Sequence, residues 1–263
     1  MAEQAEPAVL SERSGAVAWI TLNRPYAMNA INDEVRTQLP AALRAADADA
    51  AVRVIVIKGA GERAFCAGAD IKGFAEPPTP AAYRAARLQG HWIDVLEETK
   101  KPVIASIHGY CLGGGLEMAL ACDIRIAADD ASFALPEVSR GTLPGAGGTQ
   151  RLVRVAGMGR ALDMVLSAER IDAGEALRVG IVTRLVPRAE LADKTKALAE
   201  HIAGHAPLAV MFAKEAMRKA TAPDFANGLK YETDLMALLL DTEDRKEAGR
   251  AFREKRKPEF KGR

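Results

Sequence analysis

The sequence is poor in cysteine and has no long apolar run. Its 263 residues include three cysteines, none of which stands in a CxxC pair or in a spacing typical of metal ligands. This excludes a disulfide scaffold and indicates reduced thiols in a cytoplasmic protein. The first residues lack the apolar segment of a secretory signal, and no run reaches membrane-spanning length. We therefore expect neither a metal site nor a membrane partner.

An excess of one charge sign is also missing. The chain has 36 Lys and Arg against 35 Asp and Glu, so its net charge of +1 creates no general attraction for nucleic acid. The exception is the C-terminal stretch from Arg245 to Arg263, with nine Lys and Arg against three Glu. This stretch lacks interleaved aromatic residues that stack on bases, so we interpret it as a solvated helix face and expect no nucleic-acid partner.

Several common catalytic signatures are absent. The sequence contains no GxGxxG, GK[ST], GxSxG or HExxH motif, which are typical of dinucleotide, nucleoside triphosphate, serine hydrolase and zinc protease sites. His91 and His108 lie near the segments discussed below but are best interpreted as packed or solvated side chains. Cys66 and Cys111 have no clear partner that would lower a thiol pKa, so we interpret them as packing residues.

Strand and helix patterns alternate in the first half of the chain. Apolar runs rich in β-branched residues predict four strands, at 17–22, 52–57, 103–107 and 124–127. Helical spacing predicts helices at 32–46, with Asn32 as the cap, and at 80–98. Beyond residue 150 the pattern is mostly helical, with one short strand at 182–186. This order predicts an α/β fold with a mainly parallel sheet.

Three consecutive glycines, at 113–115, follow the strand at 103–107 and open an apolar helix. Glycine lets the backbone bring bare N–H groups against a ligand, and a helix N-terminus adds partial positive charge. Glu117 is the one charged residue in this opening turn. One interpretation is that Glu117 acts in catalysis beside this anion-binding turn. The other is that it stabilises the N-terminus of its own helix or pairs with an arginine, and its position alone does not distinguish the two.

A second loop of small residues, at 63–72, follows the strand at 52–57. By itself this composition predicts a plain turn. Loops that follow successive strands of a parallel sheet lie at the same sheet edge, where ligands usually bind. Two amides converging there, one from Ala69 and one from the three-glycine turn, would form an oxyanion hole.

A second glutamate follows a run of apolar residues. Glu137 comes after 132–136 and precedes the glycine-rich stretch at 141–150. Both Glu117 and Glu137 stand in apolar surroundings, where an unpaired charge is expensive to bury. Two such carboxylates beside exposed N–H groups indicate acid–base chemistry next to a developing oxyanion.

The motifs occur in an order that is specific as a set. They are Asn23-Arg24-Pro25 with Met28-Asn29-Ala30, 64–72, 101–117, Pro136-Glu137, 144–152 and Glu254-Lys255-Arg256. In this set the chain resembles the crotonase (enoyl-CoA hydratase/isomerase) superfamily over almost its whole length, and it is most similar to an enoyl-CoA hydratase.

The resemblance implies an α/β fold, a spiral of ββα turns with a C-terminal helical region. Residues 1–200 would form the spiral core with the thioester site, and 201–263 a helical region for trimerisation. The implied protein is a homo-oligomer, a hexamer built as a dimer of trimers. It would act on an acyl-CoA in fatty acid β-oxidation, with no metal and no cofactor, because CoA is part of the substrate. Surplus apolar residues from Asp224 to Leu240 also predict an interface.

The resemblance also implies roles for individual residues. The amides of Ala69 and Gly114 would form the oxyanion hole, and Glu117 and Glu137 would be the catalytic carboxylates. The residues expected to line the substrate are Ala27, Met28, Ala30, Ala67, Gly68, Asp70, Ile71, Lys72, Pro136 and Gly145. The two glutamates would hold one water over the β-carbon of an enoyl-CoA as a coupled pair, and the sequence does not assign the proton to either.

Departures from the family pattern leave the acyl preference open. Tyr26 stands where many family members carry a charged residue. Ser139-Arg140 stands where family members usually have aliphatic residues, and the stretch at 74–90 is the variable part of the family. An enoyl-CoA isomerase is the first alternative, although family isomerases generally lack the glutamate at the position of Glu117. The others are an aromatic acyl-CoA hydratase-lyase and an inactive acyl-CoA-binding or RNA-binding relative. Near-zero net charge and two intact glutamates argue against the last.

Overall fold

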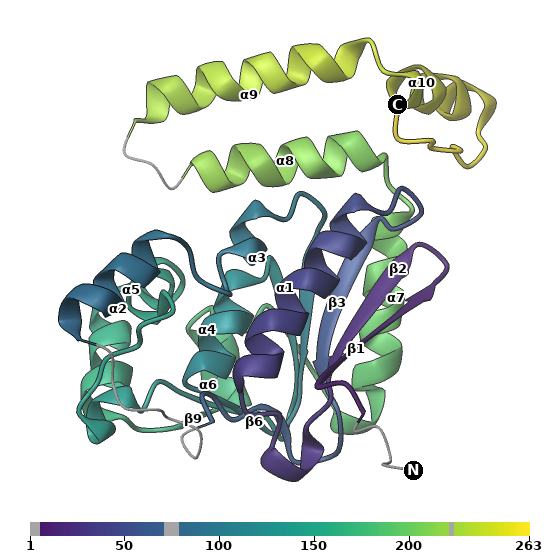
Figure 1. Ribbon diagram of the computed structural model, residues 1–263. Coiled ribbons are helices and arrows are strands. Elements are labelled where there is room, and N and C mark those ends of the chain that lie inside the picture. The colour runs from purple at the N-terminus through teal and green to yellow at the C-terminus, as the bar shows by residue number, and fades with distance from the viewer. Residues whose placement is uncertain (1–5, 71–78, 221–223) are drawn as a thin grey trace.

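The computed structural model describes residues 6–70, 79–220 and 224–263 (Figure 1). Ile71 and Lys72, which were expected to line the substrate, lie outside the described residues. In the described ranges, no helix is long and apolar enough to cross a membrane, and no group of His, Cys, Asp and Glu side chains is placed to hold a metal ion.

A six-stranded sheet forms the centre of the molecule. Its strands, in spatial order, are β1 (Val9–Ser14), β2 (Val17–Leu22), β3 (Val54–Gly59), β5 (Val103–Ile107), β7 (Ile124–Ala128) and β10 (Arg184–Val186). Only β1 and β2 pair antiparallel, and every other neighbouring pair is parallel. The predicted mainly parallel sheet is therefore confirmed, with β3 starting two residues later than expected and β1 added.

Both faces of this sheet are covered, which explains why its central strands are almost continuously apolar. Successive side chains point to opposite faces. Ile55 and Ile57 pack in the larger apolar cluster with α1 (Asp33–Ala48), whereas Val54 and Val56 pack in a second cluster with α7 (Leu191–Ala203). Figure 1 shows α1 and α7 on the two sides of the sheet.

The strands of a second, smaller sheet recur along the chain between those of the large sheet. Its strands are β4 (Ala64–Cys66), β6 (Tyr110–Leu112), β8 (Ser132–Ala134) and β9 (Ile171–Asp172). The strands β4, β6 and β8 follow β3, β5 and β7 in turn, and each pair leads into a helix: α2 (Pro80–Leu88), α4 (Gly114–Ala121) and α5 (Gly148–Ser167). This repetition is the spiral of ββα turns that the resemblance implied.

The helix predicted at 80–98 is interrupted. α2 ends at Leu88, Gly90 adopts a φ of +122°, and the short α3 (Val95–Glu98) begins after a turn in which Asp94 accepts a hydrogen bond from the His91 N–H at 2.7 Å. The helix predicted from Asn32 is confirmed, with Asn32 Oδ1 capping the Val35 N–H at 3.0 Å. The remaining short elements are η1 (Pro25–Ala27), η3 (Glu137–Arg140), α6 (Ala173–Arg178) and η4 (Arg188–Glu190).

Three helices follow α7 and lie apart from the sheet: α8 (Pro207–Lys219), α9 (Phe225–Leu240) and α10 (Glu243–Glu254). We call residues 207–263 the C-terminal arm. Figure 1 shows α8 and α9 running alongside each other above the spiral core, with α10 at the far end. The large apolar side chains exposed on the arm are Met217, Phe225, Leu229, Met236, Leu238, Leu240 and Phe252.

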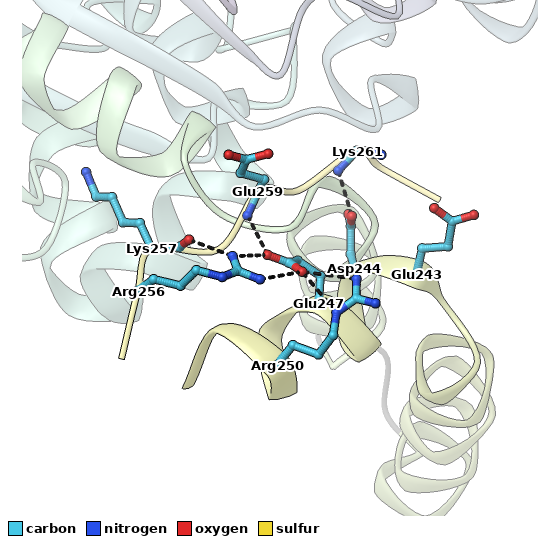
Figure 2. A pocket seen from close by; sticks show the side chains of 8 residues that line it. All are labelled: Glu243, Asp244, Glu247, Arg250, Arg256, Lys257, Glu259 and Lys261. Atoms are coloured by element: carbon cyan, nitrogen blue, oxygen red, sulfur yellow. Dashed lines mark hydrogen bonds and ion pairs between the residues drawn. The ribbon is translucent and has the colours of Figure 1, made fainter. Parts of the chain in front are cut away.

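Residues 255–263, which we call the tail, fold back onto α10 (Figure 2). Asp244 accepts hydrogen bonds from the N–H groups of Lys261 at 2.6 Å and Gly262 at 2.8 Å. Arg256 pairs with Glu247 at 2.6 Å, and this hydrogen bond lowers the pKa of Glu247 to about 2. These groups line a cavity of about 350 Å³. The charge of Arg256 is thus engaged by a carboxylate of α10.

Candidate active site

The loop after β4 pairs with the segment after η1. The N–H of Ile31 donates to Gly68 O at 2.8 Å, and the N–H of Asp70 donates to Ile31 O at 3.0 Å. Because backbone groups alternate in direction along an extended chain, these two bonds turn the N–H of Ala69 away from Ile31. Ala69 therefore presents its N–H on the opposite side of the strand.

Gly114 brings a second N–H to the same place. It is the first residue of α4, where an N–H has no acceptor within its helix. A β-carbon built on Gly114 would lie 3.9 Å from the Ala69 nitrogen, and one built on Gly68 would lie 3.4 Å from the Gly114 nitrogen. The neighbouring Gly115 is packed so closely that a β-carbon there would lie 2.3 Å from Cys66 O. Glycine is what allows the two loops to approach.

Glu117 is buried, with 3% of its surface exposed. Its Oε1 accepts hydrogen bonds from the N–H groups of Ala146 at 2.7 Å and Gly148 at 2.8 Å. Burial raises the pKa of Glu117, whereas these two hydrogen bonds act in the opposite direction and stabilise the charged form. The carboxylate thus binds the glycine-rich turn ahead of α5 rather than supporting its own helix.

Glu137 begins η3 and is half-buried. Among the described residues, its Oε2 is buried without a hydrogen-bond partner. Burial raises the pKa of Glu137 to about 6, and the nearby charge of Glu117 adds to the rise. A β-carbon built on Gly113 would lie 2.9 Å from Glu137 Oε1, so this carboxyl group rests against the three-glycine turn. The two carboxylates are electrostatically coupled, and their environments differ.

The other site residues gather around this pair. Met28 has a φ of +52°, and its carbonyl accepts a hydrogen bond from the Ala67 N–H at 3.0 Å, which joins the segment at 27–30 to the loop at 67–70. Pro136 directly precedes Glu137. A β-carbon on Gly145 would lie 3.7 Å from the hydroxyl of Tyr83 in α2. The described candidates thus come together from several segments that are distant in sequence.

Two residues that hold these loops were given no role by the sequence analysis. Arg24 is buried and donates to Ala30 O at 2.6 Å and to Asp70 Oδ2 at 2.9 Å, so the carboxylate of Asp70 is engaged in an ion pair. Asn29 is buried and donates to Ala60 O at 2.9 Å and also to the adjacent loop. The motif that contains Arg24 and Asn29 was the only sequence signal for them.

The cysteines and histidines near the site are not poised for nucleophilic or acid–base chemistry. Burial raises the pKa of Cys66 and of Cys122 to about 12, and it raises the pKa of Cys111 as well. A thiol with so high a pKa is a poor nucleophile at neutral pH. Burial lowers the pKa of His91 to about 4, and that of His108 is also lowered. This environment agrees with the interpretation of Cys66 and Cys111 as packing residues and of His91 and His108 as packed or solvated side chains.

Comparison with known proteins gives matches over nearly the whole chain. The family model described as enoyl-CoA hydratase/isomerase matches residues 12–263. The short-chain-enoyl-CoA hydratase of Clostridium acetobutylicum is 41% identical over 256 residues, covering 97% of this chain and 98% of the relative. The (E)-benzylidenesuccinyl-CoA hydratase of Thauera aromatica is 43% identical over 256 residues, covering 97% and 99%.

The solved structures agree with this result. The crystal structure of enoyl-CoA hydratase from Bacillus anthracis matches with a TM-score of 0.92 at 39% identity, covering 97% of this chain and all of the other. The fold, including the helical arm, is therefore that of solved enoyl-CoA hydratases, as the resemblance implied.

Proposed function

The chain belongs to the enoyl-CoA hydratase/isomerase family, and on that premise we propose that it hydrates the α,β double bond of an enoyl-CoA thioester to give a 3-hydroxyacyl-CoA. The observation that supports this most strongly is the pair Glu117 and Glu137, two carboxyl groups with raised pKa values beside two converging backbone N–H groups. An isomerase needs to move only a proton, whereas two coupled carboxyl groups suit the addition of water.

The thioester oxygen is bound by the N–H groups of Ala69 and Gly114. Negative charge develops on this oxygen when a nucleophile adds to the β-carbon, and donors fixed in advance stabilise it without reorganising. One such donor is worth roughly 3–4 kcal/mol in the transition state. The partial charge at the N-terminus of α4 acts in the same direction.

Glu117 and Glu137 bracket the attacking water. Two backbone hydrogen bonds favour the ionised form of Glu117 against the effect of burial, and in this mechanism Glu117 takes a proton from the water as the oxygen bonds to the β-carbon. Glu137 has a pKa of about 6 and an oxygen with no partner in the described part of the chain, and it supplies the proton that the α-carbon receives. Transfer between the coupled carboxyl groups through solvent then restores the starting state.

The CoA portion lies against the two paired loops, at Ala27, Met28 and Ala30 on one side and Ala67 and Gly68 on the other. The acyl chain extends toward Pro136 and Gly145. No separate cofactor takes part, because CoA is carried by the substrate. The relatives' names include both a short-chain and an aromatic acyl group at similar identity, so the acyl preference is left to the assay.

We also propose that the protein assembles as a trimer-based homo-oligomer, a hexamer, through the C-terminal arm. Support comes from the large apolar side chains that the arm exposes. Phe225, Leu229, Met236 and Leu240 recur on α9 at the spacing of one helix face.

The decisive experiment is incubation of the wild-type protein with crotonyl-CoA and with an aromatic enoyl-CoA in water enriched in oxygen-18. Hydration adds the mass of one labelled water to the product, whereas isomerisation leaves the oxygen content unchanged. We expect labelled 3-hydroxyacyl-CoA from at least one substrate. A product that contains no solvent oxygen, or tight binding without conversion, would contradict the proposal.

A further inference from the structure

We propose that Arg151 is a positioning residue for Glu117 and that it connects the C-terminal arm to this carboxylate. The inference rests on the proposed role of Glu117 in hydration. Arg151 lies in the first turn of α5 and is largely buried, with 18% of its side chain exposed.

Arg151 holds the turn that holds Glu117. Its Nη1 donates to Ala146 O at 2.8 Å, while the N–H of Ala146 donates to Glu117 Oε1 at 2.7 Å. Ala146 is thus fixed from both sides. At Gly147, with a φ of +95°, a β-carbon would lie 2.2 Å from Arg151 Nη1, so the guanidinium fills the space beside the turn. A shift of Arg151 would move the donor on which Glu117 depends.

Arg151 is in turn held by a carboxylate of α3. Glu97 Oε1 accepts from Arg151 Nε at 2.9 Å and lies 2.8 Å from its Nη2. The same glutamate meets Arg218 of α8, whose Nη1 donates to Glu97 O at 2.7 Å and lies 3.4 Å from Glu97 Oε2. The contacts therefore run from the arm through Glu97 and Arg151 to the turn at Ala146.

The arm also meets the other end of the helix that carries Glu117. Asp123, just after α4, binds Arg218 Nη2 at 3.0 Å and Lys214 Nζ at 2.7 Å. Lys214 is deeply buried for a lysine, with 9% of its side chain exposed, and it also donates to Lys101 O at 2.7 Å. Packing of α8 against the core thereby fixes both the C-terminal end of α4 and Glu97, the carboxylate that pairs with Arg151.

Charge gives Arg151 a second effect on Glu117. Its positive charge lowers the pKa of Glu117, against the effect of burial. Arg151 therefore favours the ionised carboxylate in addition to fixing its geometry. These two effects are separable, because lysine keeps the charge but lacks the planar fork that reaches Ala146 and Glu97 together.

The test compares Arg151→Gln, Arg151→Lys and Glu97→Gln with the matched control Arg154→Gln. Arg154 lies on the same helix, is exposed, and donates to Gln150 O within that helix. We expect R151Q to lower kcat for an enoyl-CoA by about 10- to 100-fold while KM changes by less than about 2-fold, since a misplacement near 1 Å has an effect of this order. R154Q keeps wild-type kinetics.

The pH profile separates positioning from general loss of structure. In R151Q the acidic limb of kcat/KM moves to higher pH, because one of the two arginine charges that favour ionised Glu117 is gone while Arg87 of α2 and the opposing charge of Glu137 remain. In R151K the limb stays in place while kcat falls. E97Q lowers kcat less than R151Q does and has no further effect in the R151Q background, because both changes interrupt one line of contacts.

Wild-type kinetics for R151Q, with an unmoved acidic limb, would overturn the inference while leaving hydration intact. If the wild-type protein itself hydrates no enoyl-CoA, the proposed function fails instead. If R151Q does not fold, R151K, E97Q and their double variant replace it. If neither change lowers kcat, or if the double variant loses the product of the two single losses in kcat, the proposed connection is contradicted.

Discussion

The spiral core and the C-terminal arm are stabilised in different ways. In the core, β3 and β5 are buried on both faces, and the site is assembled where the loops after these strands meet. In the arm, α8 has no buried apolar residue and α9 has only Leu235. Polar contacts join the arm to the core, among them the hydrogen bond that Arg53 donates to Phe260 O at 2.6 Å.

This contrast places the carboxyl pair in the rigid core and most of the uncovered apolar surface on the arm. Apolar burial gives the core the rigidity that a pair of carboxyl groups needs, because packed interiors resist small displacements. The arm instead leaves apolar surface uncovered within one chain, which favours association with further copies. If this division is correct, changes in the two regions will produce different kinds of defect.

The largest expected effect is loss of catalysis in the core. Glu117→Gln and Glu137→Gln should each lower kcat by about 10²- to 10⁴-fold with little change in thioester binding, because the carboxyl groups act on the water in the transition state. Steady-state kinetics and binding of a saturated acyl-CoA provide the measurements.

The double variant should be only slightly worse than either single one, since the two groups act as a unit. Glu200→Gln, an exposed change on α7, serves as the control. Near-full activity of the Glu117 variant would show that the two-carboxyl mechanism is wrong.

The sequence predicted the parts of the core whose signal is local. The strand at 103–107 and the helix capped by Asn32 follow from apolar periodicity and a capping side chain, both visible in a short window. β1 escaped prediction because only Val9 of its six residues is buried, so its composition is that of a polar segment. Strands of three residues, such as β4, are too short to show any period.

The geometry of the site depends on contacts that no local pattern contains. Glu117 and Glu137 stood out as charges in apolar runs, and the resemblance placed Ala69 with Gly114. The bonds from the turn at Ala146 to Glu117 join residues far apart in sequence and arise only when α4 and α5 pack together. The break near Gly90 was missed because the residues before it are good helix formers and an isolated glycine inside a helical pattern is tolerated.

The second prediction concerns the uncovered face of the arm. Replacing both Leu229 and Met236 by Asp should convert an oligomer into a monomer of 28.1 kDa, because two buried charges would oppose association. Asp234→Ala, at an exposed polar position of the same helix, should leave assembly unchanged. Sedimentation velocity at micromolar concentration measures this. A wild-type protein that is itself a stable monomer would show that the arm is not an interface.

The third prediction is a gain of stability on removal of the Glu137 carboxyl group. The folded protein raises the pKa of Glu137 to about 6, so it holds the proton more tightly than the unfolded chain does. The contribution of this group to stability is complete below about pH 4.5 and is lost as the pH rises through 6. Glu137→Gln should therefore exceed the wild type in unfolding free energy at pH 8, by up to about 1 kcal/mol, because solvent reaches part of the carboxyl group.

Denaturant unfolding at pH 5 and pH 8 tests this. The difference between variant and wild type should shrink at the lower pH. A variant that is less stable at pH 8 would indicate that the charged carboxylate of Glu137 is favourable in the fold.

The smallest expected effect lies in the tail of the arm. If Lys255 and Lys257, which are exposed, bind the phosphates at the nucleotide end of CoA, replacing both by Ala should raise KM for an enoyl-CoA by about 2- to 5-fold without changing kcat, because exposed charge pairs are worth well under 1 kcal/mol each. The effect should diminish with added salt. A pantetheine thioester without the nucleotide should not respond, and an equal loss with it would assign these lysines to folding or assembly.

The absorbance of the conjugated thioester, followed after adding the wild-type protein to crotonyl-CoA, tests the central claim most directly. Addition of water removes the conjugation, so we expect a loss of absorbance that proceeds to equilibrium at catalytic protein concentration. Unchanged absorbance with enoyl-CoA substrates of every chain length, from a folded protein that binds CoA thioesters, would contradict the claim that the carboxyl pair in the core is a hydration site.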